Sequence, residues 1–418
     1  MISFELNEQE TYDSSALDQL LNESVSTLES VIEGIDKYSD SLGWINVEKH
    51  ANQKVIDQVI EIAQEIKEKA DVFVLIGVGG SNNAARSVIE ALKDEVDGPE
   101  VIYSGNTLSP RQIHNTLKSL EGKSVYINCI AKNFETLEPG SSFRILRQYL
   151  YKQYGAEAAQ RIITTGTKGS SLDKLSQENG YRFLDFPEDV GGRYTAMTTV
   201  GLLPMAVAGI DIQALVSGAK MMEEKLHGDK TIENPAYRYA VFRNLNYQKN
   251  RMVEMLAFFE PQFRWFSKWW LQLFAESEGK DNKGIYPTYA EYSEDLHAVG
   301  QYVQDGAPIM FETFLNVAEA NDSVVIQPDK FEDHFEYLDG KDFWDINKAA
   351  LDATVGAHAE KLPVSKINID ALDAEHFGQL FYFYEFACYL SCEIMGVNPF
   401  DQPGVEEYKK RMFSTLKK

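Results

Sequence analysis

A short apolar run that ends in a glycine-rich turn constrains the fold of this chain more than any other feature. Residues Val72 to Ile76 are all apolar, the turn Gly77 to Ser81 follows, and apolar residues from Ala84 to Leu92 then recur at helical spacing. An uninterrupted apolar run predicts a strand buried on both faces, which is typical of parallel sheets. The segment therefore predicts a strand, a tight turn and a helix in succession.

The same unit recurs along the chain. Val125 to Ile130 is a second apolar run, followed by a polar loop to Pro139 and a helical stretch through Leu150, and a weaker strand is predicted at 162–165. In the second half, helix, strand and helix patterns alternate over 237–250, 252–258 and 263–274, and the chain opens with helical patterns at 18–35 and 55–66. We therefore expect an α/β fold with two doubly wound parallel sheets, N-terminal helices and a helical tail.

This alternation also suggests domain bounds. We expect an N-terminal helical segment at 1–50, a first α/β subdomain at 51–210, a second at 211–395 and the helical tail at 396–418. No linker of low complexity separates the subdomains, so they are expected to pack closely.

Charge and composition exclude several classes of partner. The net charge is −24, from 64 acidic against 40 basic residues, and such a field repels nucleic acid. No apolar run approaches the length of a membrane span, and the N-terminus lacks the pattern of a secretory signal, so we expect a cytoplasmic protein that does not bind membranes. Three cysteines, at 129, 388 and 392, are expected to be buried thiols. A small anionic ligand remains possible if its site is locally basic.

Two loops offer donors to such an anion. The turn Gly77 to Ser81 places backbone N–H groups, including that of Gly79, and the Ser81 hydroxyl at the start of a helix, where the dipole favours negative charge. Asn82 occupies the position of the last glycine in a dinucleotide fingerprint, and no P-loop lysine is present. The loop after the second strand offers Lys132, Asn133 and Thr136 at the same edge of the sheet. Taken alone, the first turn is as well explained by packing, and the second loop is better explained as a solvated turn.

Four further residues are of types that can take part in catalysis. Each of them, taken singly, is better explained by a structural role. Arg193 follows the glycine pair that ends in Gly192, and Glu276 ends a strongly aromatic helix pattern. A carboxylate at such a position can have a raised pKa. His297 is one of seven histidines, and Lys409 belongs to a lysine pair that would ordinarily be solvated.

Together these segments resemble the signature of the glucose-6-phosphate isomerase family, in order and over nearly the whole chain. Three of the matching segments are Val190 to Tyr194 with Val200 to Pro204 after it, Gln272 to Lys280, and Asp295 to Gln301. The fourth, Gly396 to Lys409, resembles the C-terminal motif of the family closely.

The resemblance implies two sugar-isomerase (SIS-type) subdomains and a homodimer whose active sites lie at the subunit interface. It implies that Glu276 moves a proton between C2 and C1 through a cis-enediol, without metal or cofactor. His297, from the neighbouring subunit, and Lys409 would open the sugar ring, while Arg193 would stabilise the enediolate. The expected substrate-binding residues are Gly79, Ser81, Asn82, Lys132, Asn133, Glu135, Thr136, Gly192 and Gln402.

The anion-binding loops depart from the family pattern. Ala131 stands where the family has a serine, Glu135 replaces a hydroxyl residue, and Asn82, Asn83 and Ala84 follow Ser81. A carboxylate about 5 Å from a bound anion costs on the order of 3 kcal/mol per unit charge pair at a dielectric of ~20, and a dianion suffers nearly twice that. We therefore expect a hexose with a singly charged sulfonate at C6, sulfoquinovose, converted to 6-deoxy-6-sulfofructose. The alternative substrate is glucose 6-phosphate.

Two other classes of protein fit the sequence less well. A non-catalytic sugar sensor could use the same fold, but it would not need Glu276, Arg193, His297 and Lys409 together. A metal-dependent aldose isomerase would need a carboxylate and histidine cluster, which the sequence does not suggest.

Overall fold

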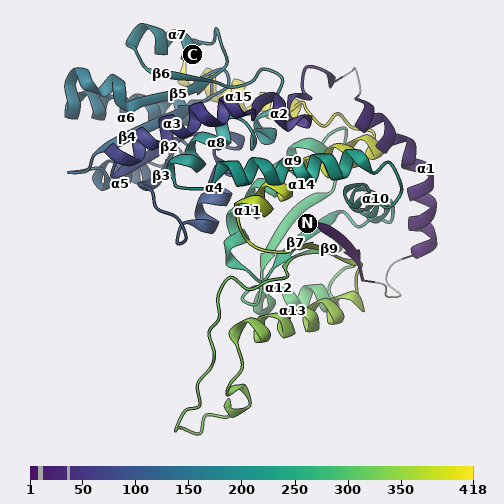
Figure 1. Ribbon diagram of the computed structural model, residues 1–418. Helices are drawn as coiled ribbons and strands as arrows, with labels where there is room; N and C mark the ends of the chain where they lie inside the picture. Colours follow the sequence, from purple (N-terminus) through teal and green to yellow (C-terminus); the bar gives the residue numbers. More distant parts are fainter. Residues whose placement is uncertain (8–12, 35–37, 418) are drawn as a thin grey trace.

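Two five-stranded sheets organise the computed structural model, which describes residues 1–7, 13–34 and 38–417 (Figure 1). The first sheet has the strand order β3-β2-β4-β5-β6 and is parallel throughout. The second has the order β1-β10-β9-β7-β8 and is parallel except for β1, which runs antiparallel to β10. The strands are β1 (Ser3–Leu6), β2 (Val72–Ile76), β3 (Glu100–Ser104), β4 (Val125–Ile130), β5 (Ile162–Gly166), β6 (Arg182–Asp185), β7 (Val253–Phe258), β8 (Tyr286–Glu291), β9 (Met310–Val317) and β10 (Val364–Ile369).

Helices connect these strands and cover the sheets. The α-helices are α1 (Ser14–Glu33), α2 (Val47–His50), α3 (Gln53–Lys69), α4 (Gly80–Leu92), α5 (Pro110–Ser119), α6 (Leu137–Tyr154), α7 (Ser171–Asn179), α8 (Thr199–Val207), α9 (Ile212–Gly228), α10 (Pro235–Gln248), α11 (Arg264–Glu278), α12 (Leu296–Asp305), α13 (Phe343–Ala359), α14 (Ala374–Met395) and α15 (Glu406–Leu416). None of the helices in the described ranges is long and apolar enough to cross a membrane.

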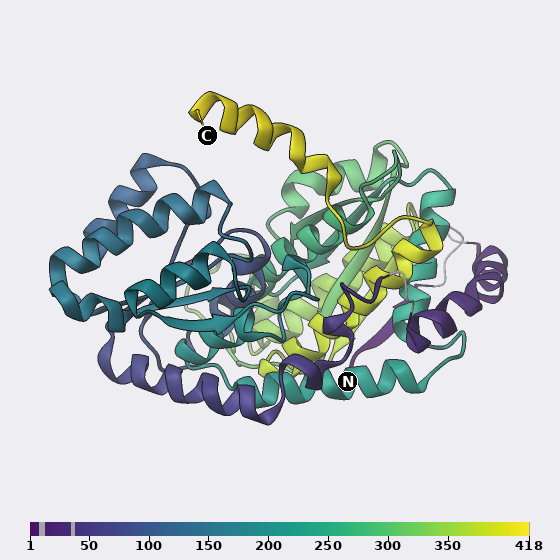
Figure 2. The ribbon, with the colours of Figure 1, turned by 90° about the horizontal axis from the view of Figure 1, so that it is seen from above.

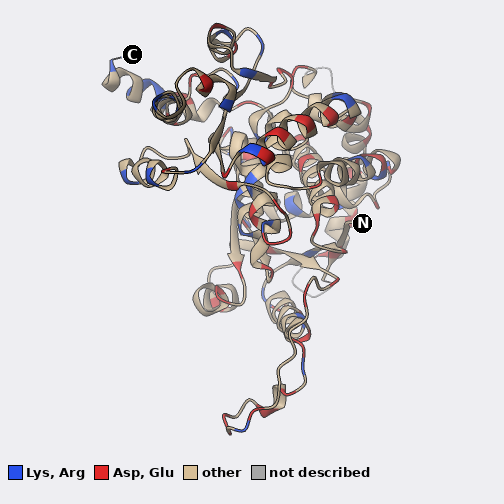
Figure 3. Cartoon of the chain, turned by 60° about the vertical axis from the view of Figure 1, so that its left-hand side comes forward, with Lys and Arg blue, Asp and Glu red and all other residues tan. Residues whose placement is uncertain are grey.

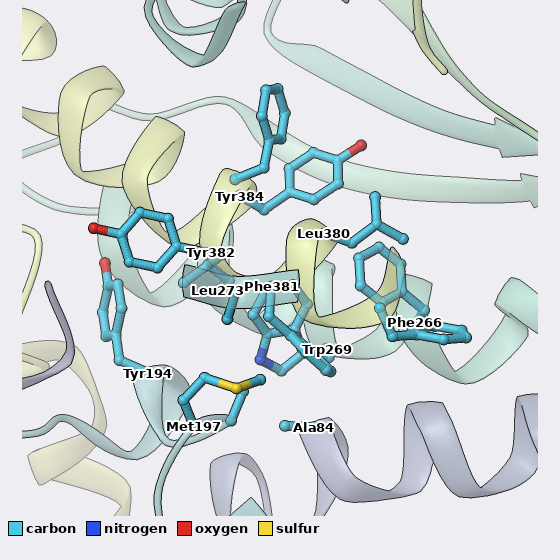
Figure 4. Close-up of a cluster of buried hydrophobic side chains, with 14 of the residues drawn as sticks. Ala84, Tyr194, Met197, Phe266, Trp269, Leu273, Leu380, Phe381, Tyr382 and Tyr384 are labelled. Carbon is cyan, nitrogen blue, oxygen red and sulfur yellow. The ribbon is translucent and has the colours of Figure 1, made fainter. Parts of the chain in front are cut away.

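Side chains alternate across the buried strands and so join each sheet to two apolar clusters. Phe73 and Leu75 of β2 face a large central cluster, whereas Val72, Val74 and Ile76 face a second cluster that includes residues of α6. The central cluster also includes the aromatic face of α11 and most of α14 (Figure 4). Trp269 and Phe381 meet there edge to face, with ring centroids 4.7 Å apart. This packing fixes α11 as a rigid support for the residues at its end.

The expected α/β fold with two parallel sheets is confirmed. The runs Val72 to Ile76 and Val125 to Ile130 are β2 and β4, and the predicted strands at 162–165 and 252–258 match β5 and β7 closely. The expected helix at 18–35 corresponds to α1, although position 35 lies outside the described residues. The buried thiols are also confirmed, since all three cysteines are free and buried.

The chain also has elements that the sequence patterns did not indicate. The N-terminal segment contains β1 as well as helices, and this strand extends the second sheet, far from its position in the chain. The segment between β9 and α13 projects away from the body (Figure 1). The C-terminal helix α15 has no buried residue and lies at the outside of the molecule (Figure 2).

Candidate active site

The first sheet brings two of the predicted loops to one edge. β2 and β4 are parallel neighbours, so the turn Gly77 to Ser81 and the loop that begins at Ala131 both leave the carboxyl edge of the sheet. From β2 the chain continues outward to β3, whereas β4 continues in the opposite direction to β5 and β6. This reversal of strand order between β2 and β4 marks the point at which doubly wound folds bind ligands.

Glycines let the turn after β2 approach the segment around Arg193. A Cβ atom at Gly80 would lie 1.8 Å from the carbonyl oxygen of Gly192, so a side chain at 80 does not fit. Gly79 has a φ of +58°, which favours glycine. The Thr195 hydroxyl donates to the carbonyls of Gly80 and Gly192 at 3.1 and 2.8 Å. The start of α4 and the predicted residue Gly192 are thereby held together.

Arg193 is fully buried and every nitrogen of its guanidinium is bonded. Nε donates to Ser277 Oγ at 2.9 Å, and Nη1 donates to Glu276 Oε2 at 3.3 Å. Nη2 donates to the carbonyls of Pro399 and Asp401, which belong to the C-terminal motif. This one side chain therefore joins three segments that are distant in sequence, namely its own, the end of α11 and the C-terminal motif.

Glu276 presents its two carboxylate oxygens to different surroundings. Oε2 accepts from Arg193 and also from Gln272 Nε2, both at 3.3 Å. Oε1 accepts no hydrogen bond from the part of the chain that the structure describes, and the side chain is 31% exposed. Oε2 is thus the anchored oxygen, and Oε1 is free to exchange a proton with a ligand.

Lys132 connects the second loop to the same region. Its ammonium donates to the backbone carbonyls of Glu188 and Val190, at 2.8 and 3.0 Å, immediately before the Gly191 and Gly192 pair. Burial lowers the pKa of Lys132. The neighbouring Thr136 precedes α6 as its N-cap residue, but its hydroxyl makes no capping bond, so this helix start keeps donors available.

A cavity of about 410 Å³ lies between the second loop and α15. Lys132, Asn133, Glu135 and Thr136 line it from the loop, and Lys409 lines it from the helix. Lys409 Nζ lies 2.8 Å from Glu406 Oε1, and this contact, with a smaller contribution from Glu135, raises the pKa of Lys409.

The expectation that an anion site is locally basic is only partly met. In that cavity three lysines, including Lys410 beside Lys409, stand against three carboxylates, those of Glu135, Glu138 and Glu406. Basic residues lie along α15 near the C-terminus (Figure 3). The positive and negative charges of the described residues that line the cavity are therefore equal in number. The first turns of α4 and α6 add partial positive charge from their helix dipoles.

Within the described ranges, the other predicted site residues form no hydrogen bond with Arg193 or Glu276. Ser81 is half-buried in the first turn of α4, and Asn82 is buried, with no hydrogen-bond partner for its Oδ1 among the described residues. Gln402 is exposed before the short 3₁₀ helix Pro403–Val405. His297 is exposed in the first turn of α12.

The chain does not bring His297 to Glu276. His297 follows the carboxyl end of β8, whereas α11 ends shortly before β8 begins. The two residues therefore lie toward opposite ends of a strand of six residues, which spans roughly 20 Å at about 3.3 Å per residue.

Sequence reasoning did not single out several residues that complete the site. Gln272 lies one helical turn before Glu276, a spacing that could have indicated a shared face. Ser277 and the carbonyls of Pro399 and Asp401 carried no signal of their own. Within the described residues, no group of three or more His, Cys, Asp or Glu is arranged to hold a metal ion.

Solved structures share this architecture. A hypothetical protein from Thermus thermophilus superposes with a TM-score of 0.90 at 24% identity, over 100% of both chains. A glucose-6-phosphate isomerase from Chlamydia trachomatis superposes with a TM-score of 0.84 at 17% identity, over 100% of this chain and 88% of the other. At these identities the likeness concerns the fold alone.

Sequence comparisons go further than the fold. A glucose-6-phosphate isomerase from Staphylococcus aureus is 42% identical over 397 residues, which cover 93% of this chain and 90% of that protein. One from Staphylococcus saprophyticus matches to the same extent. The family model described as phosphoglucose isomerase matches residues 49–418. The chain therefore belongs to the phosphoglucose isomerase family of enzymes.

Proposed function

We propose that this enzyme interconverts glucose 6-phosphate and fructose 6-phosphate. The observation that carries the proposal is the contact between Glu276, with one open carboxylate oxygen, and the fully buried Arg193. A base beside a fixed cation is the arrangement that an enediol reaction needs. Relatives that are 42% identical over almost the whole chain are named glucose-6-phosphate isomerases, which supports this substrate.

Glu276 moves the proton in the proposed reaction. Oε1 takes the proton from C2 of the open-chain aldose, the C–H electron pair forms the C1–C2 double bond, and negative charge develops on the carbonyl oxygen. Arg193 stabilises that charge without losing its own proton, because a guanidinium stays protonated. A proton passes from O2 to O1, and return of the C2 proton from Glu276 to C1 then forms the C2 carbonyl of the ketose.

The two loops of the first sheet supply the proposed anion site. The Ser81 hydroxyl, the backbone at the start of α4, and Asn133 and Thr136 before α6 offer neutral donors, and Lys132 and Lys409 offer charge. The two loops leave the first sheet where its strand order reverses, and we assign the C6 end of the sugar to this edge.

Two observations make that site compatible with a phosphate dianion. Ala131 packs its methyl group in the apolar cluster of the first sheet, so its lack of a hydroxyl does not bear on an anion outside that cluster. Glu135 shares its cavity with Lys132 and Lys409, and the positive charges of these lysines offset part of the repulsion between its carboxylate and a bound anion. Glu135 therefore disfavours a dianion less than an isolated carboxylate would.

Sulfoquinovose is the second candidate substrate. The observation in its favour is that Glu135 still lines the cavity beside Lys132, Asn133 and Thr136. A singly charged sulfonate would be repelled less by this carboxylate than a phosphate dianion.

The deciding measurement is kcat/KM for both hexoses, side by side at one pH and ionic strength. We expect a clear preference for glucose 6-phosphate, and Glu135→Thr should change the ratio of the two values by less than about tenfold, or 1.4 kcal/mol. Glu121→Gln on the surface serves as the matched control. A preference for sulfoquinovose that Glu135→Thr reverses would assign the chain to the sulfonate instead.

We further propose that the active enzyme is a homodimer in which the partner supplies His297 for ring opening. The separation of His297 from Glu276 within one chain supports this arrangement.

A further inference from the structure

We propose that Asn83 is a positioning residue for the isomerisation. In this proposal Asn83 acts through Gln272, whose amide donates to Glu276 and leaves Oε1 as the oxygen that takes the proton. The inference rests on the proposed function, and it concerns a position at which the chain departs from the family pattern after Ser81.

A chain of side-chain hydrogen bonds runs from α4 to the base. Asn83 Nδ2 donates to Gln272 Oε1 at 2.7 Å, and Gln272 Nε2 donates to Glu276 Oε2 at 3.3 Å. Gln272 also lies against Gly79, where a Cβ atom would stand 2.9 Å from Nε2. The amide of Gln272 is therefore held along the first turn of α4.

The donor and acceptor groups determine the direction of each hydrogen bond in this series. An ionised carboxylate only accepts hydrogen bonds, so Gln272 must turn its NH₂ group toward Glu276 and its oxygen toward Asn83. That oxygen then needs a donor, which Asn83 supplies. An acceptor at position 83 would attract the NH₂ group of Gln272 instead. The amide oxygen of Gln272 would then face the carboxylate oxygen of Glu276.

The two carboxylate oxygens of Glu276 therefore have different roles. Gln272 and Arg193 both anchor Oε2, while Oε1 receives no donor from the described residues. Without Asn83, the amide of Gln272 can turn over, and the ionised form of Glu276 loses one of its two donors. The rate of proton transfer should then fall while substrate binding changes little, because Asn83 is assigned no contact with the sugar.

The test compares Asn83→Asp with Asn83→Leu. Aspartate keeps the shape of asparagine without its donor, and leucine removes the donor without adding charge. In both variants the acidic limb of the kcat–pH profile should move up by about half to one pH unit, so kcat at a fixed pH on that limb should fall roughly three- to tenfold. KM for glucose 6-phosphate should stay within about twofold.

Two controls separate positioning from other effects. Asn115→Asp adds the same charge on the exposed side of α5 and should leave the profile unchanged. Gln272→Leu should shift the limb as Asn83→Leu does, and the double variant should shift it no further, because both changes break one chain of bonds. Thermal unfolding confirms that each variant is folded.

The outcomes are distinguishable. A limb that moves in the aspartate variant alone indicates a charge effect and overturns the proposal, as do additive shifts in the double variant. An unmoved limb in an active enzyme overturns the role of Asn83 and leaves the proposed function standing. If the unaltered enzyme turns over neither hexose, both the proposed function and this inference fail.

Discussion

Arg193 shows how one buried side chain can join three distant segments. Its guanidinium donates to Ser277 and Glu276 on α11 and to the carbonyls of Pro399 and Asp401, while its own carbonyl accepts from Trp269 Nε1 at 3.3 Å. A planar fork of five N–H donors fits these acceptors, whereas an ammonium group has three donors at one point.

Arg193→Lys should therefore lower both activity and stability. We expect kcat to fall about 10²- to 10³-fold, because the stabilisation of the enediolate is lost. The free energy of unfolding should fall by about 2–3 kcal/mol, since buried carbonyls lose their donor. Steady-state kinetics and urea unfolding measure the two effects.

Arg182→Lys is the matched control for this substitution. Arg182 donates to Glu65 Oε2 at 2.7 Å on the surface, and such pairs contribute little, so its stability should change by less than about 0.5 kcal/mol. If Arg193→Lys kept the activity of the unaltered enzyme, the role assigned to the guanidinium would be wrong.

At the scale of elements, the contact between the start of α4 and Gly192 holds the first loop against the segment that carries Arg193. Gly80→Ala should break this contact, because its Cβ atom would overlap the carbonyl oxygen of Gly192. We expect the free energy of unfolding to fall by about 3 kcal/mol, together with a loss of activity as Gly79 and Asn83 shift.

Gly140→Ala offers a control of the same chemistry. Gly140 lies in α6 with nothing within 4 Å of an added Cβ atom, so alanine should stabilise the enzyme by about 0.5–1 kcal/mol through its helix propensity. Urea unfolding of both variants decides the matter. Equal stabilities would mean that α4 can move away from Gly192 at little cost.

The elements that the sequence predicted are those with simple apolar patterns. β2 and β4 are continuous apolar runs, and α11 has a dense aromatic face. By contrast, β9 was not identified, because Glu312 and Thr313 interrupt its apolar run. Both are fully buried: Tyr292 donates to Glu312 at 2.6 Å, and Thr313 donates to Glu254 at 2.8 Å. A buried polar residue whose hydrogen bonds are all made interrupts an apolar pattern, so such a pattern does not reveal the strand that contains it.

The candidate site was predictable to a similar extent. The segments around Arg193 and Glu276 were singled out through family resemblance, and the structure joins them by a hydrogen bond. The bond between Asn83 and Gln272 connects residues 189 positions apart, and no periodicity relates such positions. Contacts between elements arise from the packing of α4 on α11, which the sequence does not encode locally.

At the scale of the whole molecule, the position of His297 bears on whether the active enzyme is one chain or a dimer. If His297 takes part in ring opening, one chain alone is incomplete, because its own Glu276 lies toward the other end of β8. In a two-fold symmetric dimer, each site would take Glu276 from one chain and His297 from the other.

Mixing two inactive variants tests this arrangement. Glu276→Gln and His297→Ala should each be inactive alone, but after unfolding and refolding together, half of the dimers carry one chain of each kind. Each such dimer has one site with both residues intact and one site with neither, so an equal mixture should recover about a quarter of the activity of the unaltered enzyme. Recovery should rise and fall with the fraction of mixed dimers, which differently tagged chains make measurable. If His297 acted within its own chain, each mixed dimer would hold no complete site, and the mixture would stay as inactive as its components.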